Sequence, residues 1–249
     1  MKNIYIIAGG PGDPDLLTLK GKKIIDQSDY IFMSERYLDR AMLKDIKGSC
    51  QILDSFSYSY DEKLALAKKA VAEGQRISFI SMGDPSLYGM VGGLVDRFEK
   101  NGLDFEIVPG VSAAAASSAI LKRGFTDLGV TNTSVYTSFT GGPEGREKLE
   151  KIARLDASVS IFMGTAHLAE IVDIFTSHRG PDTPIALIVK ATWKDEEKIL
   201  GNLSNIRAKL GQRDLKHGLI LIGDFINRDY SYDLEREFAR MKKKERRDQ

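Results

Sequence analysis

The stretch "IYIIAGGPGDPDLLTLKGKKII", residues 4–25, decides the fold class of this chain. An apolar run ends at Ala8, a turn rich in glycine and proline follows, and a pattern typical of a helix comes next. This order of strand, tight turn and helix opens many α/β domains that bind nucleotides. Pro11 and Pro14 stand inside the turn, however, and proline has no backbone N–H with which to hold a phosphate.

The turn does not match the known phosphate-binding loops. Gly10 and Gly12 occupy the first two glycine positions of G-x-G-x-x-G, but Asp15 stands at the third, and Asp13 adds a second carboxylate. A Walker loop is excluded as well, because Leu16 occupies the position of its first glycine. We expect the loop to approach a ligand that is not a phosphate. The alternative is a tight turn with a purely structural role.

Apolar runs alternate with helical patterns along the first half of the chain. We expect strands at residues 3–8, 30–33, 51–54, 76–81 and 105–108, and helices at 16–27, 61–73, 88–101 and 111–121. Such alternation predicts a mostly parallel sheet with helices on its faces.

The polar segment 123–133 is interpreted as a linker, after which the pattern starts again. We expect further strands at residues 134–138, 158–163, 184–189, 198–202 and 218–223, and helices at 145–154, 166–176 and 203–210. The sequence thus predicts two α/β domains with mostly parallel or mixed sheets, residues 1–122 and 134–228. Residues 229–249 end in "ARMKKKERRDQ" and are interpreted as a charged, frayed tail in solvent.

Composition excludes several classes of function. The chain carries 36 basic and 35 acidic residues, a balance that gives no electrostatic case for binding nucleic acid. No apolar run reaches the ~18 residues of a membrane helix, and the first residues lack the layout of a signal peptide. The single cysteine, Cys50, allows no internal disulfide. We therefore expect a cytoplasmic protein that binds neither nucleic acid nor a membrane.

Two further loops use the same residue types as the first turn. "FISMGDPSLYG", residues 79–89, and "EIVPGVSAAAASSA", residues 106–119, each begin in an expected strand and lead into an expected helix. Ligands of open α/β sheets bind beyond the carboxyl ends of the strands. Three such loops therefore predict one binding site at that edge of the sheet.

Together the three loops resemble the tetrapyrrole methylases, which transfer a methyl group from S-adenosylmethionine to a carbon of a porphyrin-like ring. The matching motifs are "GPGDPDLLT" at residues 10–18, Gly83-Asp84-Pro85, and "VPGVSA" at residues 108–113. The resemblance runs from residue 2 to about residue 226, and its motifs are specific in combination. S-adenosylmethionine carries no phosphate, so a loop stiffened by proline can pack on it without offering N–H groups to an anion.

Within that family, "KATWKDE" at residues 190–196 and "MGDPSLYG" at residues 82–89 resemble the precorrin-4 C11-methyltransferases of the cobalamin pathway. Residues 32–38 and 138–145 depart from the pattern of that subfamily, and both segments are expected near the ring substrate. Another precorrin, uroporphyrinogen III or an acceptor that is not a tetrapyrrole is therefore the alternative substrate. A domain that binds the cofactor without catalysis is the alternative from a different functional class.

The resemblance implies a cleft between the two domains that binds S-adenosylmethionine. The residues that it assigns to the cofactor are Pro11, Met82, Gly83, Asp84, Ser112, Ala113, Met163, Ala191 and Leu219. Asp84 suits the ammonium or sulfonium side by its charge, and a local turn at the following proline is its alternative role. The family also implies a homodimer.

A ring that carries several carboxylates needs basic partners, and arginine and lysine are the suitable residues. Arg36 and Lys190 are the expected substrate-binding cations, and Tyr88 is expected to face the ring. We expect no metal site and assign no catalytic base. A methyl sulfonium is already an activated electrophile, so that transfer depends on holding the acceptor carbon close to it.

Overall fold

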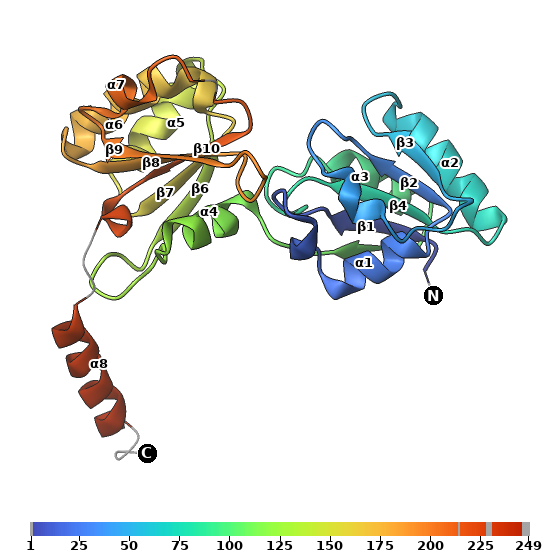
Figure 1. Ribbon diagram of the computed structural model, residues 1–249, viewed down its shortest axis with the longest axis horizontal. Helices are drawn as coiled ribbons and strands as arrows, with labels where there is room; N and C mark the ends of the chain where they lie inside the picture. Colours follow the sequence, from blue (N-terminus) through green and yellow to red (C-terminus); the bar gives the residue numbers. More distant parts are fainter. Residues whose placement is uncertain (1, 214, 228–230, 246–249) are drawn as a thin grey trace. The chain divides into compact units, whose positions relative to one another are not determined.

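The computed structural model describes residues 2–213, 215–227 and 231–245. The chain divides into two compact units (Figure 1). Unit 1 comprises the described residues up to Ala116 together with Thr192–Lys194, and unit 2 comprises Ser117–Ala191 with the described residues from Asp195 onward. The division falls inside helix α4 (Ala113–Leu121), whereas the sequence interpretation assigned that helix to the first domain.

Unit 1 contains a five-stranded sheet in which every pairing is parallel. Its strand order is β3-β2-β4-β1-β5, with bounds β1 (Ile4–Ala8), β2 (Tyr30–Met33), β3 (Gln51–Asp54), β4 (Ile77–Ser81) and β5 (Phe105–Val108). The central strand β1 is buried along its whole length, as expected where helices cover both faces of a parallel sheet. The expected parallel sheet is therefore confirmed for this unit.

Helices cover both faces of this sheet (Figure 1). Helix α1 (Leu19–Asp26) and the short 3-10 helix η2 (Arg40–Leu43) pack with Ile7 and Ile31 on one face. The opposite face packs, through residues such as Phe32 and Phe79, against helices α2 (Tyr60–Ala72) and α3 (Gly92–Lys100). The chain thus leaves the neighbouring strands β1 and β4 toward opposite faces. Their carboxyl ends consequently border the crevice in which ligands of open α/β sheets bind.

Two helices of unit 1 begin later than the sequence indicated. Thr18 caps α1, because its Oγ1 accepts the N–H of Gly21 at 3.0 Å, and the preceding residues form a separate 3-10 turn, η1 (Pro14–Leu16). Helix α3 begins at Gly92 rather than at residue 88, because Tyr88 and Met90 adopt φ values of +59° and +53° that no α-helix allows.

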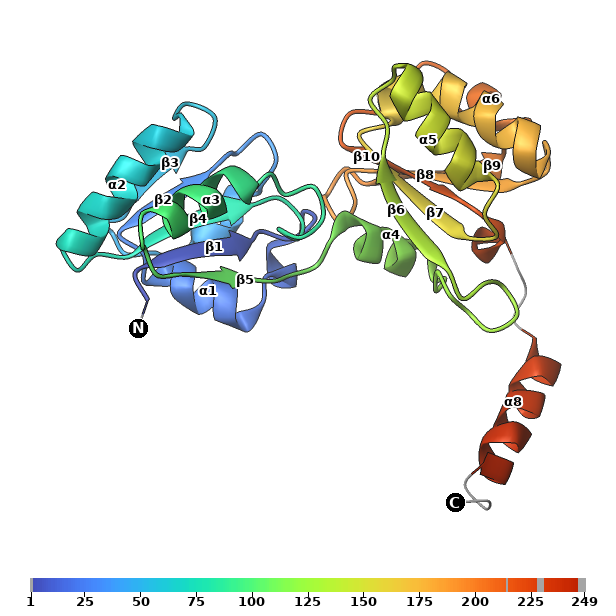
Figure 2. The ribbon, with the colours of Figure 1, turned by 180° about the vertical axis from the view of Figure 1, so that it is seen from behind.

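Unit 2 contains a mixed sheet with the strand order β6-β7-β10-β8-β9. The strands are β6 (Ser134–Ser138), β7 (Ser158–Phe162), β8 (Pro184–Val189), β9 (Glu197–Asn202) and β10 (Gly218–Ile222), and only β6 and β7 pair in parallel. Helices α5 (Pro143–Ala153), α6 (Leu168–Arg179) and α7 (Ile206–Leu210) pack on one face of the sheet (Figure 1), and Figure 2 shows α5 and α6 from behind. The short 3-10 helices η3 (Thr165–His167) and η4 (Asp224–Ile226) follow β7 and β10.

The expectation of a frayed tail is wrong for residues 232–245, which form helix α8 (Tyr232–Glu245). Acidic residues lie in its first turn, where they interact favourably with the helix dipole. Ion pairs such as Arg236–Asp233 and Lys242–Glu245 join residues three apart and also favour a helix. The remaining parts of the expected tail, residues 228–230 and 246–249, lie outside the described residues. Among the described helices, none is both long enough and apolar enough to cross a membrane.

Candidate functional site

Three loops meet at the carboxyl edge of the unit 1 sheet: the first loop (residues 9–15), the second loop (82–91) and the third loop (109–112). Gly10 and Gly83 join the first two loops, because the N–H of each donates to the carbonyl of the other at 3.2 and 2.9 Å. The N–H of Gly110 in the third loop donates to Oδ2 of Asp84 at 2.8 Å. The structure therefore brings together the three loops that the sequence singled out.

Glycine is needed in these loops because their backbones approach other atoms closely. A Cβ on Gly110 would lie 2.4 Å from the Cβ of Ala8, and one on Gly9 would lie 2.5 Å from Cδ2 of Leu38. Gly10 and Gly83 adopt φ values of +75° and +58°, in the region that favours glycine. The glycines thus permit the contacts that hold the loops together.

The first loop is also held by the segment Thr192–Lys194 of the same unit. The indole N–H of Trp193 donates to the carbonyl of Pro11 at 3.0 Å, and the N–H of Asp13 donates to Oγ1 of Thr192 at 2.9 Å. Thr192 adopts a φ of +68°, which is unusual for a β-branched residue. The sequence marked "KATW" only as a subfamily signature, and it gave no sign that Trp193 fixes the loop that contains Pro11.

Asp84 is the junction between the second and third loops. Besides the Gly110 N–H, its carboxylate accepts the N–H of Ser86 at 2.9 Å, which is the local turn considered as its alternative role. Burial acts to raise the pKa of Asp84, but the hydrogen bonds from Gly110 and Ser86 outweigh it and hold that pKa below the usual value. The carboxylate is therefore ionised at neutral pH.

The charge of the three loops selects the kind of ligand that they can bind. Their sequences contain no lysine, arginine or histidine, and they carry the carboxylates of Asp13, Asp15 and Asp84. This setting opposes a phosphate and suits a ligand with cationic groups, such as the sulfonium and ammonium of S-adenosylmethionine. Among the described residues, no cluster of acidic residues, histidine and cysteine could hold a metal ion.

The cofactor residues expected in unit 2 lie at the ends of three neighbouring strands. Strands β7 and β8 run in the same direction on either side of the antiparallel β10. Met163 directly follows β7, Ala191 lies two residues beyond β8, and Leu219 lies near the start of β10. All three therefore occupy one edge of the sheet, where Met163 and Lys190 both adopt a positive φ, of +56° and +50°.

The expected substrate-binding residues have different surroundings. Arg36 is exposed and lines a hollow of unit 1 together with Glu35 and Asp54. Tyr88 lies in the second loop and is also exposed. Lys190, in unit 2, forms an ion pair with Asp195. The role of these three residues in binding the substrate stays a prediction.

Comparisons with known proteins agree with this arrangement. The family model of the tetrapyrrole (corrin/porphyrin) methylases matches residues 3–207. A precorrin-4 C(11)-methyltransferase of Pseudomonas aeruginosa is 36% identical over 90% of each chain. A cobalt-precorrin-4 C(11)-methyltransferase of Methanocaldococcus jannaschii is 32% identical over 92% of this chain and 90% of its own.

A solved structure shares the fold as well. It is that of a cobalamin biosynthetic enzyme, cobalt precorrin-4 methyltransferase, with a TM-score of 0.85 and 27% identity over 90% of this chain and 96% of its own. The loop motifs, the two sheets and these matches lead to one conclusion: the chain belongs to the tetrapyrrole (corrin/porphyrin) methylase family.

Proposed function

We propose that this protein transfers a methyl group from S-adenosylmethionine to C11 of precorrin-4 or cobalt-precorrin-4 in cobalamin biosynthesis. The observation that carries the proposal is the loop network at the carboxyl edge of the unit 1 sheet, which is anionic and built on glycine. The precorrin-4 relatives, similar over about nine-tenths of the chain, support the choice of substrate.

Each loop has a part in binding the methyl donor. We assign Pro11, Met82 and Gly83 to its contacts, together with Ser112 and Ala113. The Gly10–Gly83 and Asp84–Gly110 hydrogen bonds hold these residues in place without a ligand having to order them. Asp84 supplies negative charge beside the cationic groups. From unit 2 we assign Met163, Ala191 and Leu219.

The transfer itself requires little chemistry from side chains. When bound, S-adenosylmethionine supplies an electrophilic methyl group on a sulfonium. The protein must hold the electron-rich acceptor carbon in line with that group, which is the contribution of proximity and orientation. We therefore assign no general base, and we assign Arg36, Tyr88 and Lys190 to positioning of the ring and its acid groups.

Further expectations concern the setting of the enzyme. We expect it to act in the cytoplasm and as a homodimer. Sedimentation of the purified protein tests the second point: a single species of twice the chain mass agrees with it, and a monomer contradicts it.

A mass-resolved methylation assay tests the function. The protein and S-adenosylmethionine are mixed separately with precorrin-4, cobalt-precorrin-4 and uroporphyrinogen III. We expect one added methyl group on a precorrin-4 form alone. Methylation of uroporphyrinogen III alone, or of no acceptor by a protein that still binds the cofactor, contradicts the proposal. In that case the departures at residues 32–38 and 138–145 become the candidates for a different specificity.

A further inference from the structure

Unit 1 contains a buried lysine that the proposed function does not use. Lys63 is only 8% exposed and lies on the inner face of α2 with Ala67 and Ala70. Lysine is almost never so buried unless it is paired. Within the described part of the chain, no hydrogen bond to its ammonium and no carboxylate within ion-pairing distance is found.

The surroundings of the Lys63 ammonium are aromatic rather than acidic. It lies 5.3 Å from the ring centroid of Tyr60 and 5.7 Å from that of Phe32. The carboxylate of Asp54 favours its charge from a distance but accepts a hydrogen bond from Ser57 instead, at 2.8 Å. Ring faces compensate only part of the solvation that an ammonium loses beside a largely apolar cavity.

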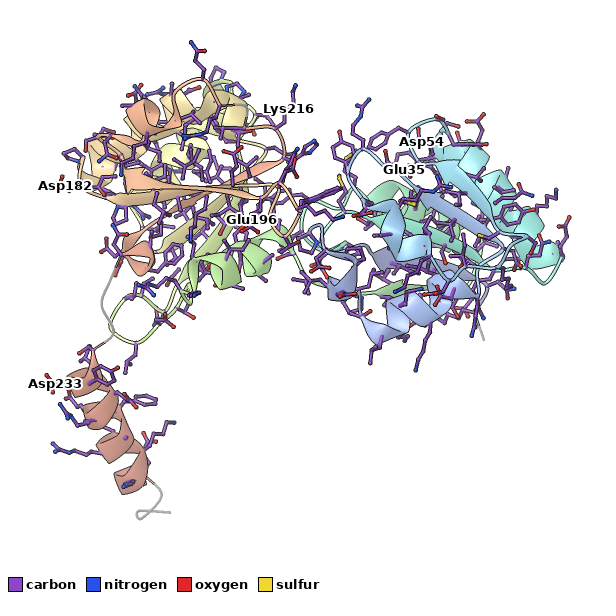
Figure 3. The ribbon with its side chains drawn as sticks, in the orientation of Figure 1. Glu35, Asp54, Asp182, Glu196, Lys216 and Asp233 are labelled. Atoms are coloured by element: carbon purple, nitrogen blue, oxygen red, sulfur yellow. The ribbon has the colours of Figure 1, made fainter. Side chains whose placement is uncertain are left out.

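The lysine lines a cavity of about 260 Å³ in unit 1. Its walls include aromatic rings and hydroxyl groups, among them Ser34, Ser55, Tyr58, Phe79 and Ser81, and no carboxylate lines it. Glu35 and Asp54, both labelled in Figure 3, line an adjoining hollow with Arg36, and the two spaces share Ser34 and Phe56. The cavity is therefore a largely apolar space with one cation and no anion of its own.

The position of the cavity connects it with the proposed site. Met82, Gly89 and Met90 of the second loop form part of its wall. The wall also includes Ser34, Tyr37 and Leu38, which belong to the segment that departs from the precorrin-4 pattern. A ligand in the cavity would thus contact both the second loop and a part of the chain in which this protein differs from the subfamily.

We propose that Lys63 binds a carboxylate arm of the tetrapyrrole substrate in this cavity, an inference that rests on the proposed function. The acid arms of such a ring consist of a short methylene chain that ends in a carboxylate. The aromatic walls suit the methylene groups, and the unpaired ammonium suits the carboxylate. The cavity is large enough for one arm but too small for the ring.

The ionisation of the lysine agrees with this role. Burial lowers the pKa of Lys63 from its usual value of 10.5, and Asp54 acts in the opposite direction. A carboxylate beside the ammonium would favour the charged form and offset the cost of burial. Ligand binding would therefore relieve an unfavourable feature of the free protein.

The test compares Lys63→Met with Lys69→Met, a substitution of a lysine whose side chain is 58% exposed on the same helix. Binding of uroporphyrin III, a stable polycarboxylic tetrapyrrole, is measured by fluorescence titration, and binding of S-adenosylhomocysteine by calorimetry. We expect Lys63→Met to weaken uroporphyrin binding by about tenfold or more, with unchanged S-adenosylhomocysteine affinity and no loss of thermal stability. Lys69→Met should behave as the wild type does.

Two results overturn the inference: uroporphyrin affinity of Lys63→Met within about twofold of the wild type, or no uroporphyrin binding by the wild type. Failure of the proposed function gives a different pattern. If the proposed function fails and the inference holds, the wild type binds uroporphyrin and Lys63→Met does not, but the wild type adds no methyl group to either form of precorrin-4.

Discussion

The edges of the two sheets that carry the assigned residues are built differently. In unit 1, parallel strands end together, and their loops are cross-linked by the Gly10–Gly83 and Asp84–Gly110 hydrogen bonds. In unit 2, the antiparallel β10 lies between β7 and β8, and one assigned residue lies at the end of each of these three strands. We infer that unit 1 provides a preorganised site, whereas unit 2 adds separate contacts. Substitutions in unit 1 should therefore have the larger effects.

The largest effect is expected from Gly110→Ala, because the added Cβ would lie 2.4 Å from the Cβ of Ala8. The third loop must then shift relative to Ala8, and we expect the shift to disturb the hydrogen bond from the Gly110 N–H to Asp84. We expect the free energy of unfolding to fall by about 1–3 kcal/mol and the affinity for S-adenosylmethionine to fall on the order of a hundredfold. Calorimetry and chemical denaturation measure the two quantities.

Gly92→Ala is the matched control, since a Cβ there meets no atom within 4 Å. It should leave both quantities nearly unchanged. Equal behaviour of the two alanine variants would contradict the assigned cause, which is the close approach of the third loop to Ala8.

A smaller effect is expected from Trp193→Phe, which keeps an aromatic ring but removes the N–H that donates to the Pro11 carbonyl. Loss of one such hydrogen bond costs about 1 kcal/mol, so the dissociation constant of S-adenosylmethionine should rise about fivefold. The circular dichroism spectrum should not change. An unaltered affinity would show that the first loop does not need this hydrogen bond.

Asp84 should make the unit 1 network sensitive to acid. Its pKa is lowered in the folded protein because the hydrogen bonds from Gly110 and Ser86 outweigh the opposing effect of burial. The unfolded chain therefore takes up the proton first, at its ordinary pKa near 3.8. The stabilisation is complete above that pH and is lost as the pH falls through the folded-state pKa.

Asp84→Asn tests this dependence. The difference in unfolding free energy between wild type and variant should shrink as the pH is lowered from about 5 to about 2. Denaturant titrations at several pH values measure it. A difference that stays constant over this range would contradict the assigned role of the carboxylate.

The smallest effect is expected in unit 2. Met163→Ala removes one exposed side chain beyond β7 and no hydrogen bond of that side chain. We expect the affinity for S-adenosylmethionine to fall about threefold by calorimetry, because an apolar side chain no longer packs on the ligand. Met241→Ala, at an exposed position of α8, should have no effect. A decrease as large as that of Gly110→Ala would contradict the larger contribution assigned to unit 1.

The sequence predicted the strands better than it predicted the helix starts. Short apolar runs gave the bounds of Tyr30–Met33 and Gln51–Asp54 as observed. The start of α1 was missed because Thr18, and not a residue before Leu16, caps the helix. The directions of the strands in unit 2 were not predictable, because apolar patterning identifies a strand without specifying its partner.

For the candidate site, the glycine and proline motifs predicted that three loops would meet. Nothing in them indicated how Trp193 or Asp84 joins the loops, since those hydrogen bonds depend on tertiary contacts. Lys63 was missed because a lysine in a helix usually faces solvent. Its spacing of four and seven residues from Ala67 and Ala70 was the signal that placed it on the buried face.

The most direct test of the central claim is a calorimetric titration of the wild-type protein with S-adenosylhomocysteine, with a nicotinamide dinucleotide titrated in parallel. The anionic loop network predicts saturable binding of S-adenosylhomocysteine at one site per chain and no binding of the dinucleotide. Binding of the dinucleotide, or no binding of S-adenosylhomocysteine, would contradict the assignment of the three loops to the methyl donor.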